Sequence, residues 1–86
     1  MEPKELQKEF IGRGEVRNFH FTQILKTDAG YIYEVKTPDL CSHYEVFQRK
    51  VNSQYNTITY PQSPSFSIYA WTFYSYADAL QKFNML

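Results

Sequence analysis

Six aromatic rings fall within the eleven positions 66–76, and this density is the feature that most restricts how the chain can fold. The 86 residues include eight tyrosines, seven phenylalanines and one tryptophan, but Cys41 is the single cysteine. A chain of this length buries only about 60–65% of its unfolded surface, so residues 1–86 are expected to form one domain. No internal disulfide can reinforce it. Because each ring buries about 150–250 Å², aromatic packing is the expected substitute.

Charge and cysteine content restrict the partners and the cellular compartment that the sequence predicts. Nine basic and nine acidic side chains give a net charge of zero, which weakens the electrostatic case for nucleic acid. The lone thiol, the lack of an Asn-x-Ser/Thr acceptor and the polar N-terminus predict a cytoplasmic protein. No apolar run approaches the roughly 20 residues that span a bilayer, so no membrane role is expected.

The N-terminal region predicts a short helix. Residues 3–10 are good helix formers, with a proline in the first turn and with Leu6 and Phe10 four residues apart. Glycines at positions 12 and 14 then end the helical pattern. Residues 1–14 are therefore expected to form a short helix or an arm that docks on the rest of the domain.

Alternating side chains predict a hairpin next. Two strands, residues 16–27 and 31–36, flank a turn at residues 28–30, which places Leu25 opposite Tyr33. One face of the hairpin is nearly all apolar. The other face is expected to be in water, and it carries four polar side chains: His20, Thr22, Glu34 and Lys36.

The second half of the chain predicts two more strands and a helix. Residues 44–51 alternate as a third strand, residues 52–65 read as a long loop, and residues 66–73 form a fourth, central or helix-backed strand. Ser75 is the expected helix N-cap with Asp78 as its capping partner. The apolar stripe of this helix is predicted to pack on the same side as Phe19, Phe21, Tyr33 and Val35.

These elements together predict the fold class α+β. The expected architecture is an antiparallel sheet of about four strands in a meander, with a C-terminal helix packed on one face and a short N-terminal helix. If the C-terminal helix covers one sheet face, the other face is expected to expose part of its aromatic set as a contact surface.

Residues suited to catalysis or metal binding are sparse. Cys41 and His43 stand two apart in a predicted loop, a spacing that rarely brings a thiol and its base together. Adding His20 would give only three metal ligands without a recognised spacing. Glu34 and Glu45 fall on one predicted face as a possible carboxylate pair, where Lys36 and Arg49 favour ordinary ion pairs. We therefore expect no catalytic residue, no metal and no cofactor.

Residues 17–24 share a basic residue and alternate aromatics with the first ribonucleoprotein strand of RNA-recognition domains. Those domains place a helix between their first two strands, whereas this chain has a hairpin turn, so the pattern does not predict membership.

The leading hypothesis is a non-enzymatic binding module that contacts a protein partner or a second copy of itself, a homodimer being the simplest case. Its predicted binding residues are Phe47, Tyr69, Trp71, Arg17, Lys36 and Arg49. The alternative is a weak single-stranded nucleic-acid binder, with those basic residues and Lys50 on the backbone and Tyr69 or Trp71 stacking on a base. A small enzyme without a recognisable motif is the third hypothesis. Trp71 is expected either to belong to the core or to lie at the centre of the interface.

Overall fold

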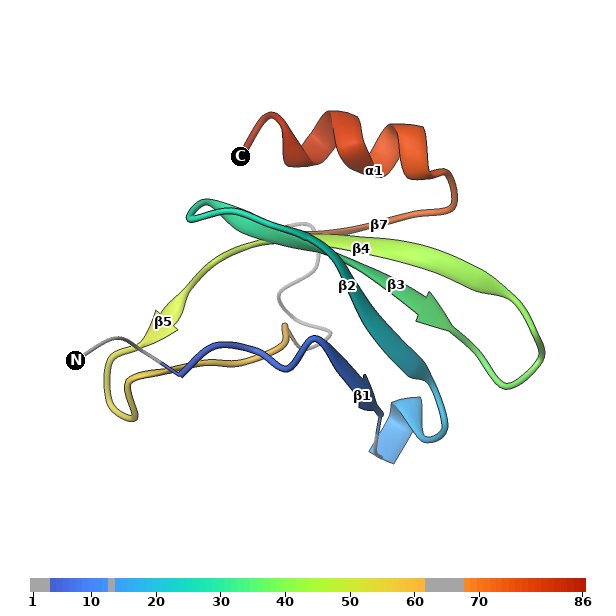
Figure 1. Cartoon of the computed structure of the whole chain (residues 1–86), viewed down its shortest axis with the longest axis horizontal. Helices are drawn as coiled ribbons and strands as arrows, with labels where there is room; N and C mark the ends of the chain where they lie inside the picture. The colour runs from blue at the N-terminus through green and yellow to red at the C-terminus, as the bar shows by residue number, and fades with distance from the viewer. Residues whose placement is uncertain (1–3, 13, 62–67) are drawn as a thin grey trace.

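The computed structural model describes residues 4–12, 14–61 and 68–86, which form an α+β fold. Five strands make one antiparallel sheet in the order β1-β2-β3-β4-β7. Their bounds are β1 Glu9–Ile11, β2 His20–Lys26, β3 Gly30–Lys36, β4 Ser42–Gln48 and β7 Ala70–Phe73. A separate pair contains β5 (Val51–Asn52) and β6 (Thr57–Ile58), and the remaining elements are the 3-10 turn η1 (Gly14–Val16) and helix α1 (Tyr76–Phe83). Figure 1 shows α1 on one side of the sheet and the N-terminal segment with β5 on the other.

The predicted fold class is confirmed as an antiparallel α+β fold with a C-terminal helix on the sheet, but the sheet has five strands. The extra strand is β1, which lies where the sequence predicts a helix. Residues 4–8 have no helical structure, and β1 pairs with β2 so that Phe10 lies opposite Phe21. The N-terminal helix prediction is therefore wrong for the described residues.

Tertiary contacts explain why this segment is extended. The Lys4 backbone N–H donates to the Asn56 carbonyl at 2.9 Å, and the Ile58 N–H donates to the Lys4 carbonyl at 2.9 Å. The rings of Phe10 and Phe21 stack with centroids 4.7 Å apart. A helix of two turns is marginal in water, so backbone pairing and ring burial outweigh its weak helix propensity.

The β2–β3 hairpin forms as predicted, but its register differs. Phe21 lies opposite Val35 and Gln23 opposite Tyr33, and the register then shifts so that Leu25 lies opposite Ile32. This β-bulge leaves Ile24 without a partner in the ladder. Because side chains alternate, the shift moves Leu25 from the face of Phe21 to the opposite face.

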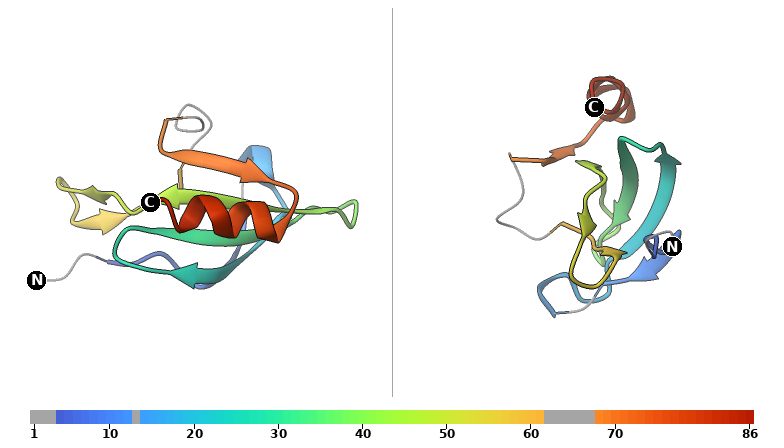
Figure 2. Two further views of the ribbon diagram at one scale, coloured as in Figure 1. Left: turned by 90° about the horizontal axis from the view of Figure 1, so that it is seen from above. Right: turned by 90° about the vertical axis from the view of Figure 1, so that its left-hand side faces the viewer.

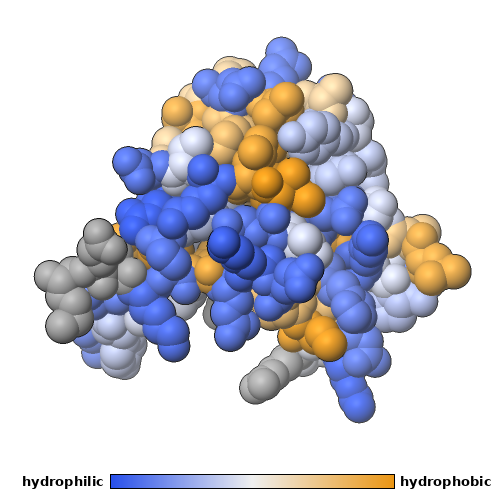
Figure 3. Space-filling model, in the orientation of Figure 1, coloured by the Kyte–Doolittle hydropathy of each residue, from blue (hydrophilic) through white to orange (hydrophobic). Residues whose placement is uncertain are grey.

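Helix α1 packs on the face that carries Leu25, which corrects its predicted placement. Its buried residues Ala79 and Phe83 contact Ile32 and Val46 in one hydrophobic cluster. The predicted placement over Phe21, Tyr33 and Val35 is wrong, because these residues lie on the opposite face. We call the side covered by α1 the helix face and the other the aromatic face. Figure 3 shows hydrophobic side chains gathered where α1 meets the sheet.

The helix is too short to cover its whole face. Eight residues extend about 12 Å, whereas a strand of seven residues extends about 23 Å. The uncovered end carries the polar side chains that the hairpin pattern predicted on one face: His20, Thr22, Glu34 and Lys36. These residues therefore share a face with α1. Among the described residues, no helix has the length and apolar character to cross a bilayer.

The aromatic face holds the larger core cluster. Tyr31 and Tyr33 are fully buried, and Phe47 is 1% exposed. The cover comes from the N-terminal segment through Leu6 and Phe10, and from Ile58 and Tyr60. Figure 2 shows this cover below the curved sheet and α1 above it. Both faces of the sheet therefore have a hydrophobic cover.

The predicted long loop of residues 52–65 overlaps the β5–β6 hairpin, which spans residues 51–58. Its later part, residues 62–65, lies outside the described residues, as do residues 66 and 67 of the predicted fourth strand. Strand β7 lies at the edge of the sheet and not at its centre. Helix α1 has Ser75 as its N-cap residue as predicted, but the predicted capping hydrogen bond is absent in the described residues.

Candidate functional site

Phe47 and Trp71 occupy very different environments, although both were predicted to bind a partner. Phe47 is buried on the aromatic face between Tyr31 and Tyr33, with ring centroids 5.2 and 5.7 Å away. It is therefore a core residue and not a surface contact. Trp71 lies opposite Val46 on the helix face and is partly exposed.

The rings of Tyr69 and Trp71 each lie beneath a lysine ammonium group. Lys50 Nζ is 4.7 Å from the Tyr69 ring centroid, and Lys82 Nζ is 4.0 Å from the Trp71 ring centroid. Tyr69 packs against the aromatic cluster, so these two rings do not share one sheet face. A nucleic-acid base that stacked on either ring would first displace a cation–π contact.

The predicted basic residues do not form one continuous positively charged surface. Lys36 ends β3 and lies opposite Ser42, whereas Arg49 and Lys50 follow the other end of β4, about 20 Å along the strand. Lys36 contacts Glu34 at 3.8 Å, and Arg17 is exposed in the turn before β2. This separation does not favour the nucleic-acid alternative, which needs a continuous positive groove.

Arg49 belongs to an ion-pair network that holds the N-terminal segment. Its Nη2 donates to Glu5 Oε2 at 2.5 Å, while Tyr31 Oη donates to Glu5 Oε1 at 2.5 Å. Lys26 Nζ lies 3.1 Å from the same Oε1 atom. The Arg49 guanidinium lowers the pKa of Glu5 to about 2, and burial together with Glu5 raises the pKa of Tyr31. The network is a structural clamp.

This clamp predicts acid-sensitive stability. The ordinary pKa of Glu5 is 4.5, and its folded value is about 2, so its contribution is complete above pH 4.5 and is lost as pH falls toward 2. Because the Glu5 side chain is 33% exposed, we expect Glu5→Gln to cost about 1–2 kcal/mol at pH 7. Urea unfolding at pH 7 and pH 2 measures this. An equal difference at both pH values would contradict the assignment.

A second polar network lies at the edge of the aromatic face. His43 Nε2 is 3.1 Å from Glu45 Oε2, and the Tyr60 hydroxyl donates to Glu45 Oε1. Burial and the adjacent Glu45 carboxylate raise the pKa of Tyr60 well above its usual value. Glu45 thus joins the other two side chains, since each hydrogen-bonds to one of its carboxylate oxygens. This arrangement fastens Tyr60 to β4.

The other titratable residues weighed from the sequence are separated. Glu34 lies opposite Tyr44 and Glu45 opposite Tyr33, so the two carboxylates point to opposite faces and do not pair. Cys41 is exposed in the β3–β4 turn. Within residues 4–12, 14–61 and 68–86, no three His, Cys, Asp or Glu side chains form a group that could hold a metal.

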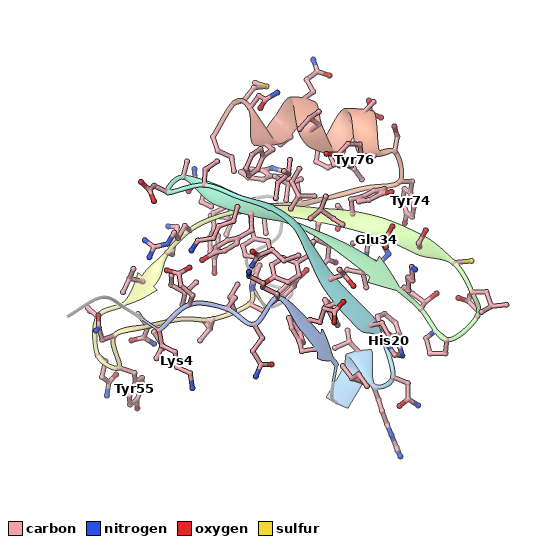
Figure 4. The ribbon with its side chains drawn as sticks, viewed as in Figure 1. Lys4, His20, Glu34, Tyr55, Tyr74 and Tyr76 are labelled. Atoms are coloured by element: carbon pink, nitrogen blue, oxygen red, sulfur yellow. The ribbon has the colours of Figure 1, made fainter. Side chains whose placement is uncertain are left out.

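The largest exposed aromatic side chain near the sheet lies where β7 turns into α1. Tyr74 is 84% exposed and Tyr76 39% exposed, and Ile68, just before β7, is 72% exposed. Figure 4 shows Tyr74 and Tyr76 together at the start of the helix, with Tyr55 at the far end of the molecule. The Tyr76 ring is 5.5 Å from the Tyr44 ring, and the Tyr74 ring is 6.1 Å from His43. Ile68 lies at the opposite end of β7 from these two rings. We call the surface formed by Tyr74 and Tyr76 the β7–α1 corner.

The sequence pattern did not predict binding roles for Ile68, Tyr74 or Tyr76. Side-chain alternation predicted a strand over all of residues 66–73, whereas the strand in the described residues begins at Ala70. A signal was present in the sequence, because residues 68–77 contain no charged residue, proline or glycine. Comparison with protein-family models, curated proteins and solved structures found no match.

Proposed function

We propose that this protein is a small non-enzymatic binding module that contacts another protein chain through the β7–α1 corner. The observation that carries the proposal is the exposure of the neighbouring Tyr74 and Tyr76 side chains in a segment without charge. Isolated exposed apolar residues are ordinary, but a contiguous group of them is typical of a contact surface. Tyrosine is enriched at such surfaces because its ring buries a large apolar area while its hydroxyl can still form a hydrogen bond.

The remaining described groups support binding over catalysis. His43 and Tyr60 both hydrogen-bond to Glu45, and Glu5 hydrogen-bonds to Arg49 and Tyr31 and pairs with Lys26. An acid–base site needs such groups to face a substrate, with a pocket to hold it. The groove lined by Phe10, Ile11, Phe21 and Thr22, together with the titratable residues Glu9 and His20, contains neither network.

Site-specific photocrosslinking tests the proposal. A benzophenone amino acid at position 74 should give a discrete crosslinked protein product in living cells that express the chain. The matched control is the same amino acid at position 55, because Tyr55 is 68% exposed and lies at the far end of the molecule. Absence of a product from position 74, or the same products from both positions, would contradict the proposed function.

A further inference from the structure

The outer edge of β7, on the side away from β4, carries backbone groups that no described strand pairs. In the described sheet β7 is the last strand, and no other described strand pairs with its outer side. The Gln48 N–H donates to the Tyr69 carbonyl at 2.9 Å, and the register continues with Val46 opposite Trp71. Hydrogen-bonded residues alternate along an antiparallel strand, so the N–H and C=O groups of Ala70 and Thr72 point outward.

This edge is short, at four residues, but it lacks the chemical features by which proteins usually prevent edge-to-edge pairing. Such features are charged side chains, prolines and bulges, and none occurs in residues 68–77. The opposite edge differs, because β1 includes Glu9 and directly follows Lys8. Strand addition is therefore favoured at β7 and disfavoured at β1.

From these observations, and resting on the proposed function, we propose that the partner is a second copy of this chain, which pairs its own β7 antiparallel to β7. A second copy presents an identical uncharged edge, and the net charge of zero creates no overall repulsion between copies. Pairing of like edges about a two-fold axis closes after one addition and produces a dimer. The product is a continuous ten-stranded sheet with both helices on one side.

The alternation of side chains restricts the register. A two-fold axis perpendicular to the sheet keeps each side chain on its own face, and the outward groups of both strands must meet. Centring the axis at Thr72 satisfies both conditions. It pairs Thr72 with its copy, Trp71 with Phe73, and the small Ala70 with the large Tyr74. The exposed Tyr74 and Ile68 side chains then flank the contact.

Sedimentation equilibrium of the purified chain tests the pairing directly. The unmodified protein should show a reversible monomer–dimer equilibrium. Thr72→Lys, which places two ammonium groups opposite each other across the axis, should weaken dimerisation at least about tenfold. The matched control is Thr59→Lys, at another exposed threonine near β6, which should leave dimerisation unchanged. Near-ultraviolet circular dichroism establishes that each variant is folded.

A second variant and a crosslink test the backbone geometry. Thr72→Pro removes an outward N–H that β4 does not use, so the fold should persist while dimerisation is lost. Thr72→Cys in a Cys41→Ser background should form an intermolecular disulfide with oxidised glutathione, since directly paired Cα atoms lie about 5.5 Å apart. Thr59→Cys in the same background should not.

The outcomes separate this inference from the proposed function. A chain that stays monomeric up to millimolar concentration, yet crosslinks from position 74 to a different protein, would overturn self-pairing and leave the binding function intact. A monomer with no crosslink would overturn both. A dimer that Thr72→Lys and Thr72→Pro do not weaken would overturn the β7 interface.

Discussion

Phe47→Ala is expected to cost about 3–5 kcal/mol, enough to leave a domain of this size largely unfolded at 25 °C. Phe47 is 1% exposed, and its ring lies within 6 Å of the rings of Tyr31, Tyr33 and Tyr60. The Phe47→Ala change loses the hydrophobic transfer free energy of the ring. It also leaves a cavity, because the surrounding rings cannot fill the space unless β3 and β4 move. Urea unfolding followed by far-ultraviolet circular dichroism measures the loss.

Two controls make this result specific to the core. Leu40→Ala removes an apolar side chain that is 96% exposed, so it should change the free energy of unfolding by less than about 0.5 kcal/mol. Trp71→Ala should cost less than Phe47→Ala, because Trp71 is only partly buried beneath Lys82. A Phe47→Ala protein as stable as Leu40→Ala would show that the aromatic cluster is not the main source of stability.

The parts of the fold that local sequence determines were predictable. Turn residues 28–30 between two alternating segments gave the β2–β3 hairpin, and Ser75 marked the start of α1. These predictions depend on contacts within a few residues, where side-chain periodicity and turn chemistry are sufficient. The number of rings predicted an aromatic core, and one forms around Tyr31, Tyr33 and Phe47. Phe47 was predicted to bind a partner, however, and no described ring of the dense stretch 66–76 is fully buried.

The bulge at Ile24 was not predictable from the same rules. Alternation assigns Leu25 to the face of Phe21, but the shifted register transfers it to the face of Ile32. That transfer supplies an additional apolar residue beneath α1, which packs there with Val46 and Phe83. A single unpaired residue thus moves Leu25 to the face that the helix covers, and nothing in its local pattern distinguishes it.

The N-terminal segment shows how long-range contacts outweigh local propensity. Leu6 and Phe10 are spaced for a helix, yet both pack on the aromatic face from an extended chain. The partner that fixes Glu5 is Arg49, 44 residues away, and such a contact has no sequence signature. The same limitation applied to the candidate site, because exposure at Tyr74 and Tyr76 depends on where α1 begins relative to the sheet edge.

Tyr60 should be nearly as sensitive as Phe47, although it follows β6 in a segment without regular structure. Its ring contacts Phe10, Phe21, Tyr33 and Phe47 with centroids 5.6, 5.0, 5.2 and 4.8 Å away, respectively. Its hydroxyl donates to Glu45. The ring therefore joins the N-terminal strand to the centre of the sheet, and the hydroxyl fixes its position. Substitutions at this residue can separate these two contributions.

We expect Tyr60→Ala to cost about 3–5 kcal/mol and Tyr60→Phe about 1–2 kcal/mol. The alanine variant loses every ring contact, whereas the phenylalanine variant keeps the ring and leaves Glu45 Oε1 without its tyrosine donor. Urea unfolding of both variants beside the Leu40→Ala control measures the two losses. Equal costs for alanine and phenylalanine would assign the whole effect to the hydroxyl. If neither variant lowered the free energy of unfolding, the segment after β6 would not be needed to cover the aromatic face. The stack of Phe10 on Phe21 would then be stable without Tyr60.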